Sequence, residues 1–385
     1  MRGADGWPGS CGGAEPGFAL AAAVFALLIL SALAAGAFYA AFEEVRIGRN
    51  SRAAESAFEA AEAGLSRATA DGPPGGWGAM PVGDSAHFAG TLPSGTGRFS
   101  GAFLRLNGQL FLVRSTGTDA AGEGQRTVAA LARLDSAGVG LAAALVAGGR
   151  VVLGRGSLLD GRDTGPPAWS GCPAAGRPSL PGLALPGAGD LEVAACGAGC
   201  VAGEPPVRAD PALADAVPLQ VGGADWGALA RVAAKTYAAG GQGLVVVPSP
   251  SQSGAACDPS APDNWGEPAR PPVVAPCAGY LPVILVTGNL TMAGGRGQGV
   301  LLVDGDLVLT GGAEFDGLVL VRGSLRAAGA GGRIRGGVVV AVTGGALAAS
   351  LEGASITYSG CALAAALRNA MPARLIPERS WSELY

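Results

Sequence analysis

Acidic side chains are the residues of this sequence whose spacing could most readily do chemistry. Paired carboxylates act as general acid and base in sugar hydrolysis, and carboxylate oxygens are the ligands that Ca²⁺ prefers. An acid beside glycine is also the ordinary composition of a solvated turn. Because no motif shows that these acids converge, we expect no catalytic residue, no metal site and no cofactor, and we do not expect an enzyme. The acidic pairs are Asp160 and Asp163, Asp304 and Asp306, and Glu314 and Asp316.

Other residues with reactive side chains are few. His87 is the only histidine and Lys235 is the only lysine, and the sequence contains no Gly-x4-Gly-Lys loop that would cradle a phosphate. The net charge of -4 and the pI of about 5.2 leave no broad basic field. We therefore expect neither a nucleotide-driven motor nor a nucleic-acid partner.

The positions of the cysteines indicate that most of the chain lies in an oxidising compartment. Cys11 precedes a long apolar segment, and the other cysteines all follow it. An even set on one side of a membrane segment is typical of disulfides formed in an oxidising compartment, although their pairing stays open. Zinc is the alternative, because Cys196-x3-Cys200 is near a metal-binding spacing, but the single histidine favours disulfides. The disulfide candidates are Cys172, Cys196, Cys200, Cys257, Cys277 and Cys361.

The apolar segment runs from Phe18 to Phe42 without a charged side chain. A helix rises about 1.5 Å per residue, so this segment is long enough to cross a hydrocarbon core of about 30 Å. A cleavable secretory signal has a shorter apolar core, of about 7 to 15 residues, and does not continue into a polar helix. We therefore expect a single membrane span.

The helix is expected to continue beyond the span, because small and apolar residues recur at steps of three and four as far as Ala68. Asp71-Gly72-Pro73-Pro74 ends the pattern, since proline and the residue before it do not suit a continuing helix. The predicted helix covers residues 18–70. Its second half is also suited to packing on the chain's own head. The residues assigned to helix packing are Ala22, Ala54, Phe58, Ala61 and Leu65.

The start of this helix has a family pattern: "GFAL" from Gly17 and "GRNSRAAESAFEAAEAGL" from Gly48. It resembles the amino-terminal region of PilX-type type IV pilus assembly proteins and related minor pseudopilins, over residues 17–70 and more weakly to residue 134. The resemblance implies a prepilin-type leader over residues 1–17, cleavage after Gly17 by a prepilin peptidase, and methylation of Phe18. It also implies that the helix packs with other pilins or pseudopilins in a filament core.

Two features depart from the family pattern. Ala22 stands where many pilins carry a glutamate that helps a subunit to dock onto one already in place, and its absence implies a position at the filament tip. Arg2 precedes the span and Arg46, Arg49 and Arg52 follow it, so the arginine count alone would place the large domain in the cytoplasm. The cysteines and the resemblance favour the opposite orientation. We therefore expect an inner-membrane anchor with a periplasmic or extracellular head.

A small antiparallel sheet is expected over residues 71–136. Three strand-like runs lie within residues 97–134, and Asn107-Gly108 separates the first two as a type I′ hairpin turn. The last run, over residues 126–134, alternates weakly enough to be an inner strand. The resemblance implies that this sheet lies against the helix.

Residues 137–385 are expected to form a Gly-rich β-solenoid, or parallel β-helix. A strand, a glycine turn and a second strand recur about every 17 or 18 residues, with turns at Gly288, Gly305 and Gly323. A diverged copy begins at Ala144. Each coil of such a repeat buries its apolar side chains on its neighbours. The alternative is an antiparallel meander of valine-rich strands.

An insertion rich in proline and cysteine separates the first copy from the others, over residues 164–280. Within it we predict one helix, from Asp225 to Ala239, ended by Gly240-Gly241. Long insertions on a repeat scaffold often form a binding face, here for a surface or polysaccharide ligand.

These observations predict an α+β fold that joins a pilin-like transmembrane helix and small sheet to a parallel β-helix. The expected function is that of a minor pilin or pseudopilin of a type IV pilus or type II secretion filament, which displays its head for assembly priming or cell adhesion. The alternative is a membrane-anchored β-helix protein that binds or cleaves polysaccharide.

Overall fold

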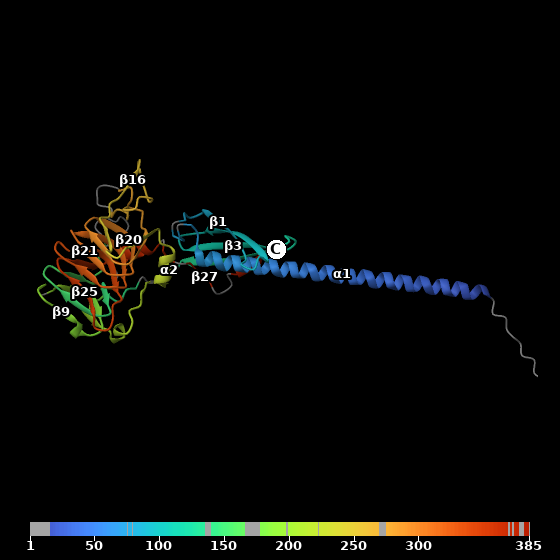
Figure 1. The fold of residues 1–385 in the computed structure, drawn as a ribbon, viewed down its shortest axis with the longest axis horizontal. Helices are drawn as coiled ribbons and strands as arrows, with labels where there is room; N and C mark the ends of the chain where they lie inside the picture. Colours follow the sequence, from blue (N-terminus) through green and yellow to red (C-terminus); the bar gives the residue numbers. More distant parts are fainter. Residues whose placement is uncertain are drawn as a thin grey trace, which may run out of the picture.

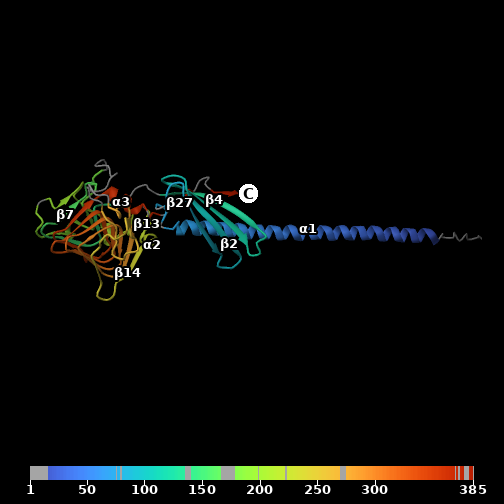
Figure 2. The same cartoon turned by 90° about the horizontal axis from the view of Figure 1, so that it is seen from above.

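The protein has three parts: a long projecting helix, a small sheet packed on the end of that helix, and a block of parallel strands beyond the sheet (Figure 1, Figure 2). Their arrangement comes from a computed structural model. Residues described by the structure are 16–74, 76–78, 80–134, 140–165, 178–197, 199–221, 223–268, 275–368, 370–371, 373–376 and 381–384. Most of the predicted leader and Cys172 lie outside these ranges.

Helix α1 (Pro16–Asp71) is continuous over 56 residues, which confirms the predicted helix and its end. Gly72 follows it with a φ of 71°, and the Gly72 N–H donates to the Ala68 carbonyl at 2.8 Å. This left-handed glycine is the usual end of a helix, and the prolines that follow cannot extend it.

The sheet is antiparallel and lies against the last part of α1. The hairpin at Asn107 is confirmed, and the Asn107 side chain accepts from the N–H groups of Gln109 and Leu110, both at 2.9 Å. The type I′ turn is wrong, because such a turn needs positive φ and Gly108 has none. The first four strands, in spatial order, are β1 (Ser85–Thr91), β2 (Gly97–Arg105), β3 (Leu110–Asp119) and β4 (Gln125–Leu134).

The carboxyl terminus completes this sheet. Strands β27 (Ala373–Leu375) and β28 (Trp381–Leu384) both pair antiparallel with β4, which makes β4 an inner strand as predicted. Assigning all of residues 137–385 to the second domain was therefore wrong. Such short strands carry too little alternation to reveal a pairing so distant in sequence. We call α1, β1–β4, β27 and β28 the helix–sheet unit.

The core of the helix–sheet unit is aromatic toward one end of β3 and made of small residues toward the other. Trp77 packs edge-on against Phe103 and Phe111, at centroid distances of 5.2 and 5.0 Å. Where α1 crosses β3, a Cβ on Gly117 would lie 2.2 Å from the Ala57 carbonyl oxygen. The helix therefore rests directly on the strand backbone, which only glycine allows.

The residues from Leu145 to Tyr358 contain a block of parallel strands, which we call the parallel stack. The two large sheets of this block pair in parallel throughout their described strands, so the antiparallel meander is wrong. One of the two sheets has seven strands and lies on the side away from α1 (Figure 1). We call it the third wall, because the larger sheet forms two other walls. Its strands, in spatial order, are β15 (Leu244–Val246), β19 (Leu290–Ala293), β21 (Leu307–Thr310), β23 (Leu325–Ala327), β25 (Leu347–Leu351), β6 (Arg150–Leu153) and β9 (Leu191–Val193).

A column of glycines divides the larger sheet into two walls. Gly299, Gly317 and Gly336 are register partners, with positive φ of 108°, 138° and 140°. A Cβ on Gly317 would lie 2.0 Å from the Gly299 carbonyl oxygen, and a Cβ on Gly336 would meet Gly317 in the same way. Both the backbone angle and the close stacking thus require glycine. The strands that carry the column are β20 (Arg296–Val303), β22 (Ala313–Val321) and β24 (Gly332–Val340).

Residues before the glycine column form the first wall, and residues after it form the second wall. The first wall continues through β26 (Ser355–Tyr358), β7 (Leu158–Asp160) and β10 (Val201–Ala202). The second wall adds β18 (Val283–Thr287) and β14 (Lys235–Ala238) on one side, and β5 (Leu145–Ala147), β8 (Leu183–Leu185) and β11 (Val207–Ala209) on the other.

The coils follow a different order in space from their order along the chain. The chain enters the stack in its middle, at β5, and coils outward to β11 at one end. It then crosses to β14 at the opposite end and coils back until β26 pairs with β7. The diverged copy at Ala144 therefore stacks directly on the last copy, through pairs such as Leu145 with Val338.

The insertion over residues 164–280 is more regular than predicted, since several of its strands extend both ends of the stack. The predicted helix from Asp225 to Ala239 is wrong in its second half: α2 covers only Trp226–Arg231, and β14 follows it. The open edge of β18 supplies β14 with backbone partners, which overrides local helix preference. Its smaller elements are η1 (Ala188–Asp190), η2 (Pro211–Ala214), β12 (Gln220–Val221), β13 (Ala224–Asp225), β16 (Gln252–Ser253) and β17 (Ala256–Cys257).

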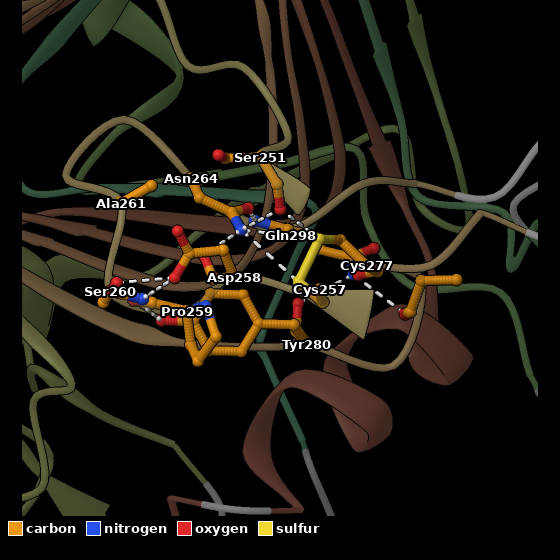
Figure 3. Close-up of a disulfide and its surroundings, with 12 residues drawn as sticks. Ser251, Cys257, Asp258, Pro259, Ser260, Ala261, Asn264, Cys277, Tyr280 and Gln298 are labelled. Carbon is orange, nitrogen blue, oxygen red and sulfur yellow. Dashed lines mark hydrogen bonds between the residues drawn. A yellow bond between two sulfur atoms is a disulfide. The ribbon is translucent and has the colours of Figure 1, made fainter. Parts of the chain in front are cut away.

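A disulfide-closed loop extends the first wall beyond β20. The Gln298 N–H donates to the Trp265 carbonyl at 2.8 Å, as a further strand would accept it. Cys257 and Cys277 are bonded beside the fully buried Asn264, whose Nδ2 donates to the Asp258 carbonyl at 2.7 Å (Figure 3). The loop thus satisfies the buried side-chain amide of Asn264 with its own backbone.

Helix α3 (Gly360–Leu367) carries the chain from the stack back to the sheet. Ser359 caps it by accepting from the Ala362 N–H at 3.3 Å. The helix packs over the glycine column, where a Cβ on Gly317 would lie 3.1 Å from the Ala366 Cβ.

Candidate functional site

The first half of α1, which we call the bare half (residues 20–52), is the most unusual surface of the protein. Its large apolar side chains are exposed, with Leu20 at 72%, Phe38 at 72% and Phe42 at 77%. The most apolar window of the helix has a mean hydropathy of 2.4 and is 0% buried. By length and composition this helix could cross a membrane.

Apolar residues surround the axis of the bare half. Leu27, Leu28, Ile29 and Leu30 are consecutive and all exposed, so their side chains point in every direction around the helix. A helix that is apolar all round is typical of a membrane span or of the inside of an assembly. Each such side chain gains about 1.5 to 3 kcal/mol on full burial, so the bare half requires lipid or protein around it.

Charged residues mark where the bare half leaves its apolar region. Glu43 and Arg46 form an exposed ion pair, with Nη1 and Oε1 3.8 Å apart, and Arg49 follows one turn later. An ion pair of this kind contributes little stability in water. Its place, after Phe42, is where an uncharged span would reach the polar edge of a membrane.

The second half of α1 is covered by the sheet of its own chain. Ala57, Ala60 and Ala61 are fully buried, and Leu65 is 4% exposed. The alanine-lined face therefore serves packing within the chain over this half, as the sequence also allowed. Gly117 is the residue that sequence reasoning missed here; an isolated glycine inside a strand run was the available signal.

The residues assigned to processing and helix packing thus fall into different environments. Ala22 is exposed on the bare half, and Phe58 is half-buried with its ring 6.0 Å from that of Trp381. Ala54 is also half-buried, at the border of the two halves. Gly17 and Phe18 belong to the first turn of α1.

The acidic pairs do not converge on one site. Asp304 contacts Arg322 at 2.7 Å, and Asp306 accepts from the Ser324 N–H at 2.7 Å, so each bonds to the next coil. Asp163 accepts from the Gly360 N–H at 2.9 Å, at the start of α3. These carboxylates therefore join coils and cap a helix.

Two further acids are paired with arginine. Arg162 donates to Asp160 through Nε and Nη2, and this hydrogen bond lowers the pKa of Asp160. Arg335 holds the buried Asp316 with two guanidinium nitrogens. Over the part of the chain that the structure describes, no group of three or more His, Cys, Asp or Glu could hold a metal ion.

Two disulfides are seen among the cysteines predicted to form them: Cys196 with Cys200, and Cys257 with Cys277. Cys361 is disulfide-bonded as well. The cysteines assigned to zinc in the alternative interpretation are thus oxidised. His87 is exposed on β1, and Lys235 is buried, where its Nζ donates to the carbonyls of Pro259 and Ala261 at 3.0 and 2.7 Å. Burial lowers the pKa of Lys235.

Comparisons with known proteins add little to this geometry. No family model matches the chain, and no curated protein matches it. Among solved structures, the crystal structure of the competence-associated pilin ComZ from Thermus thermophilus is 14% identical, with a TM-score of 0.22. That match covers 86% of this chain and 97% of that chain. Because the two do not superpose at such a score, the likeness assigns neither a family nor a function to this chain.

Proposed function

We propose that this chain is a pilin-like subunit that is held in the bacterial inner membrane by the bare half and passes into a filament by that same surface. The observation that carries the proposal is the division of one continuous helix: its first half is apolar and uncovered, and its second half is buried on an antiparallel sheet. The bare half can leave the lipid and pack against the corresponding helices of neighbouring subunits, while the helix–sheet unit and the parallel stack keep their structure.

The finer assignment is a minor pilin or pseudopilin, processed by a prepilin peptidase after Gly17 and methylated at Phe18. Support comes from the "GFAL" motif and from the absence of an acid at Ala22, which suits a tip position. In this proposal the parallel stack is a β-helix head displayed in the periplasm or outside the cell. The third wall lies on the side away from α1, so it would face outward at a tip (Figure 1).

Mass spectrometry of the mature amino terminus tests the proposal. Cells that express the chain with an active prepilin peptidase should yield a chain beginning with N-methylated Phe18. Replacement of Gly17 by Leu should block this cleavage. The matched control is Gly36→Leu, in the middle of the bare half, where a Cβ meets nothing within 4 Å. An intact Met1 in the presence of the peptidase would contradict the proposal.

Orientation has its own test. A phosphatase fused after Leu134 should be active, because the enzyme folds only outside the cytoplasm. Activity only of a reporter that requires the cytoplasm would place the parallel stack on the other side, as the arginine count favours.

A further inference from the structure

The first wall of the parallel stack carries an open groove. Two adjoining cavities, of about 680 and 330 Å³, share Gly312 and Glu314 in their linings. The larger reaches Ser355 on β26 and Leu158 on β7, and the smaller reaches Arg296 on β20. The groove therefore runs across five parallel strands, a shape that suits an extended chain.

Arginines surround a single glutamate on the floor of this groove. Glu314 lies between Arg296 and Arg333, because the three residues are register partners on adjacent strands. Its carboxylate is 3.6 Å from Arg296 Nε, 3.5 Å from Arg333 Nη1 and 3.8 Å from Arg335 Nη2. At about 4.8 Å between strands, the backbones of Arg296 and Arg333 are about 10 Å apart.

The three arginines differ in how strongly they are already bonded to carboxylates of the protein. Arg335 is occupied, since it donates to Asp316, which is 1% exposed. The side chains of Arg296 and Arg333 are 43% and 52% exposed. Their N–O distances to Glu314, 3.6 and 3.5 Å, are too long for a strong hydrogen bond. Their remaining N–H donors are thus open to a ligand in the groove.

Other lining groups define the chemistry of that ligand. Thr164, Ser355 and Thr357 place hydroxyl groups along the same groove. Among the described residues that line the two cavities none is aromatic, so single-stranded nucleic acid lacks a stacking platform. Glu314 and Glu267 also oppose a polyphosphate, whose binding relies on many uncompensated cations.

We propose that this groove binds a chain of an acidic polysaccharide. Carboxylates of the chain contact the guanidinium groups of Arg296 and Arg333, a pairing that can be bidentate. Sugar hydroxyls contact the hydroxyl groups of Ser355 and Thr357. The site binds without cleaving, because both carboxylates of β22 lie beside arginines: Asp316 accepts hydrogen bonds from Arg335, and Glu314 forms longer ion pairs with its arginine neighbours. The proposal goes beyond the filament role, and it can be tested on the unprocessed chain.

The test uses calorimetry to measure how the full-length chain, in detergent micelles, binds alginate and dextran. Alginate, a linear polyuronate, should bind, and its affinity should fall when salt is added. Uncharged dextran should not bind. Arg333→Gln and Arg296→Gln should each weaken alginate binding about tenfold, as expected for the loss of one charge-assisted hydrogen bond. Glu314→Gln should strengthen it severalfold, since that variant frees both guanidinium groups.

The matched control is Arg326→Gln, an exposed arginine on β23 in the third wall, which should leave alginate binding unchanged. Circular dichroism of each variant checks that it is folded. Absence of alginate binding, equal binding of dextran, or equal loss in Arg326→Gln and Arg333→Gln would each overturn the proposal. Tighter binding of a DNA duplex, with the same dependence on Arg333, would overturn it in favour of a nucleic-acid site.

Discussion

Glycine serves the helix–sheet unit and the parallel stack in different ways. In the helix–sheet unit, Gly117 makes room for a helix: its φ is ordinary, and what excludes a side chain is the backbone of α1 above it. In the stack, Gly317 makes a corner: its φ is 138°, and what excludes a side chain is the next coil. The first need is for space alone, and the second is for space and a left-handed backbone.

The two regions also differ in what closes them. The aromatic group around Trp77 fills the helix–sheet unit, and no disulfide is seen there among the described residues. The stack has bonded cysteines in the segments that join its strands, including the loop beyond β20. A block of short strands has open ends, and crosslinked loops restrain those ends.

The largest effect is expected from Gly317→Val. This variant should lose at least about 3 kcal/mol of stability, because it adds backbone strain to a clash with the Gly299 carbonyl. Hydrogen exchange measured by mass spectrometry should show faster exchange in β20, β22 and β24, with β2–β4 unchanged. Gly240→Val is the control, since nothing lies within 4 Å of its Cβ. Equal deprotection of β2–β4 would mean that the two regions unfold as one.

Removal of the disulfide beyond β20 should come next. Serine at both Cys257 and Cys277, which are 20 residues apart, should cost about 3 kcal/mol. The exchange should quicken first in β14, β15 and β18, at that end of the stack. Serine at Cys196 and Cys200, only 4 residues apart, should cost less, about 2 kcal/mol. A larger loss from the shorter loop would contradict the loop-closure explanation.

In the helix–sheet unit, Gly117→Val should cost about 2 kcal/mol, because α1 must move away from β3. Exchange should quicken in β3 and in the covered half of α1, and the stack should be unaffected. Gly108→Val, in the β2–β3 loop with nothing within 4 Å of its Cβ, should be nearly neutral. Equal effects of the two variants would show that α1 does not rest on Gly117.

The smallest effect concerns acid. Because the hydrogen bond from Arg162 lowers the pKa of Asp160, the native carboxyl holds its proton more weakly than the unfolded one. Its stabilisation is therefore present above the ordinary aspartate range, about pH 4, and is lost as the pH falls further. Unfolding by urea from pH 6 to 2 should show a shallower acid loss in Asp160→Asn, by less than about 1 kcal/mol since Arg162 is mostly exposed. Arg162→Gln should reproduce this result, and the two substitutions together should not add.

Local pattern was enough for the elements that depend on near neighbours. The extent of α1 follows from an apolar run, an alanine-rich face and a Gly-Pro end, and all of these lie within the helix or one turn of it. The β2–β3 hairpin follows from Asn107-Gly108, and the repeating glycines at Gly288, Gly305 and Gly323 indicate stacked coils. The helix and the hairpin were predictable because helix and turn preferences act over a few residues. The coils were predictable because their glycine turns repeat every 17 or 18 residues.

Pairing between distant segments was decided only in the tertiary structure. Many valine- and leucine-rich strands could stack on one another almost equally well, so the sequence does not show that Leu145 pairs with Val338. Nor does it show that β27 and β28 pair with β4. It also does not show that Lys235–Ala238, within the predicted helix, forms a strand at the edge of β18. Arg296, Glu314 and Arg333 likewise become neighbours only through register. The physical reason is that the side chains determine which residues are buried, whereas the order of equivalent strands depends on how the whole stack closes.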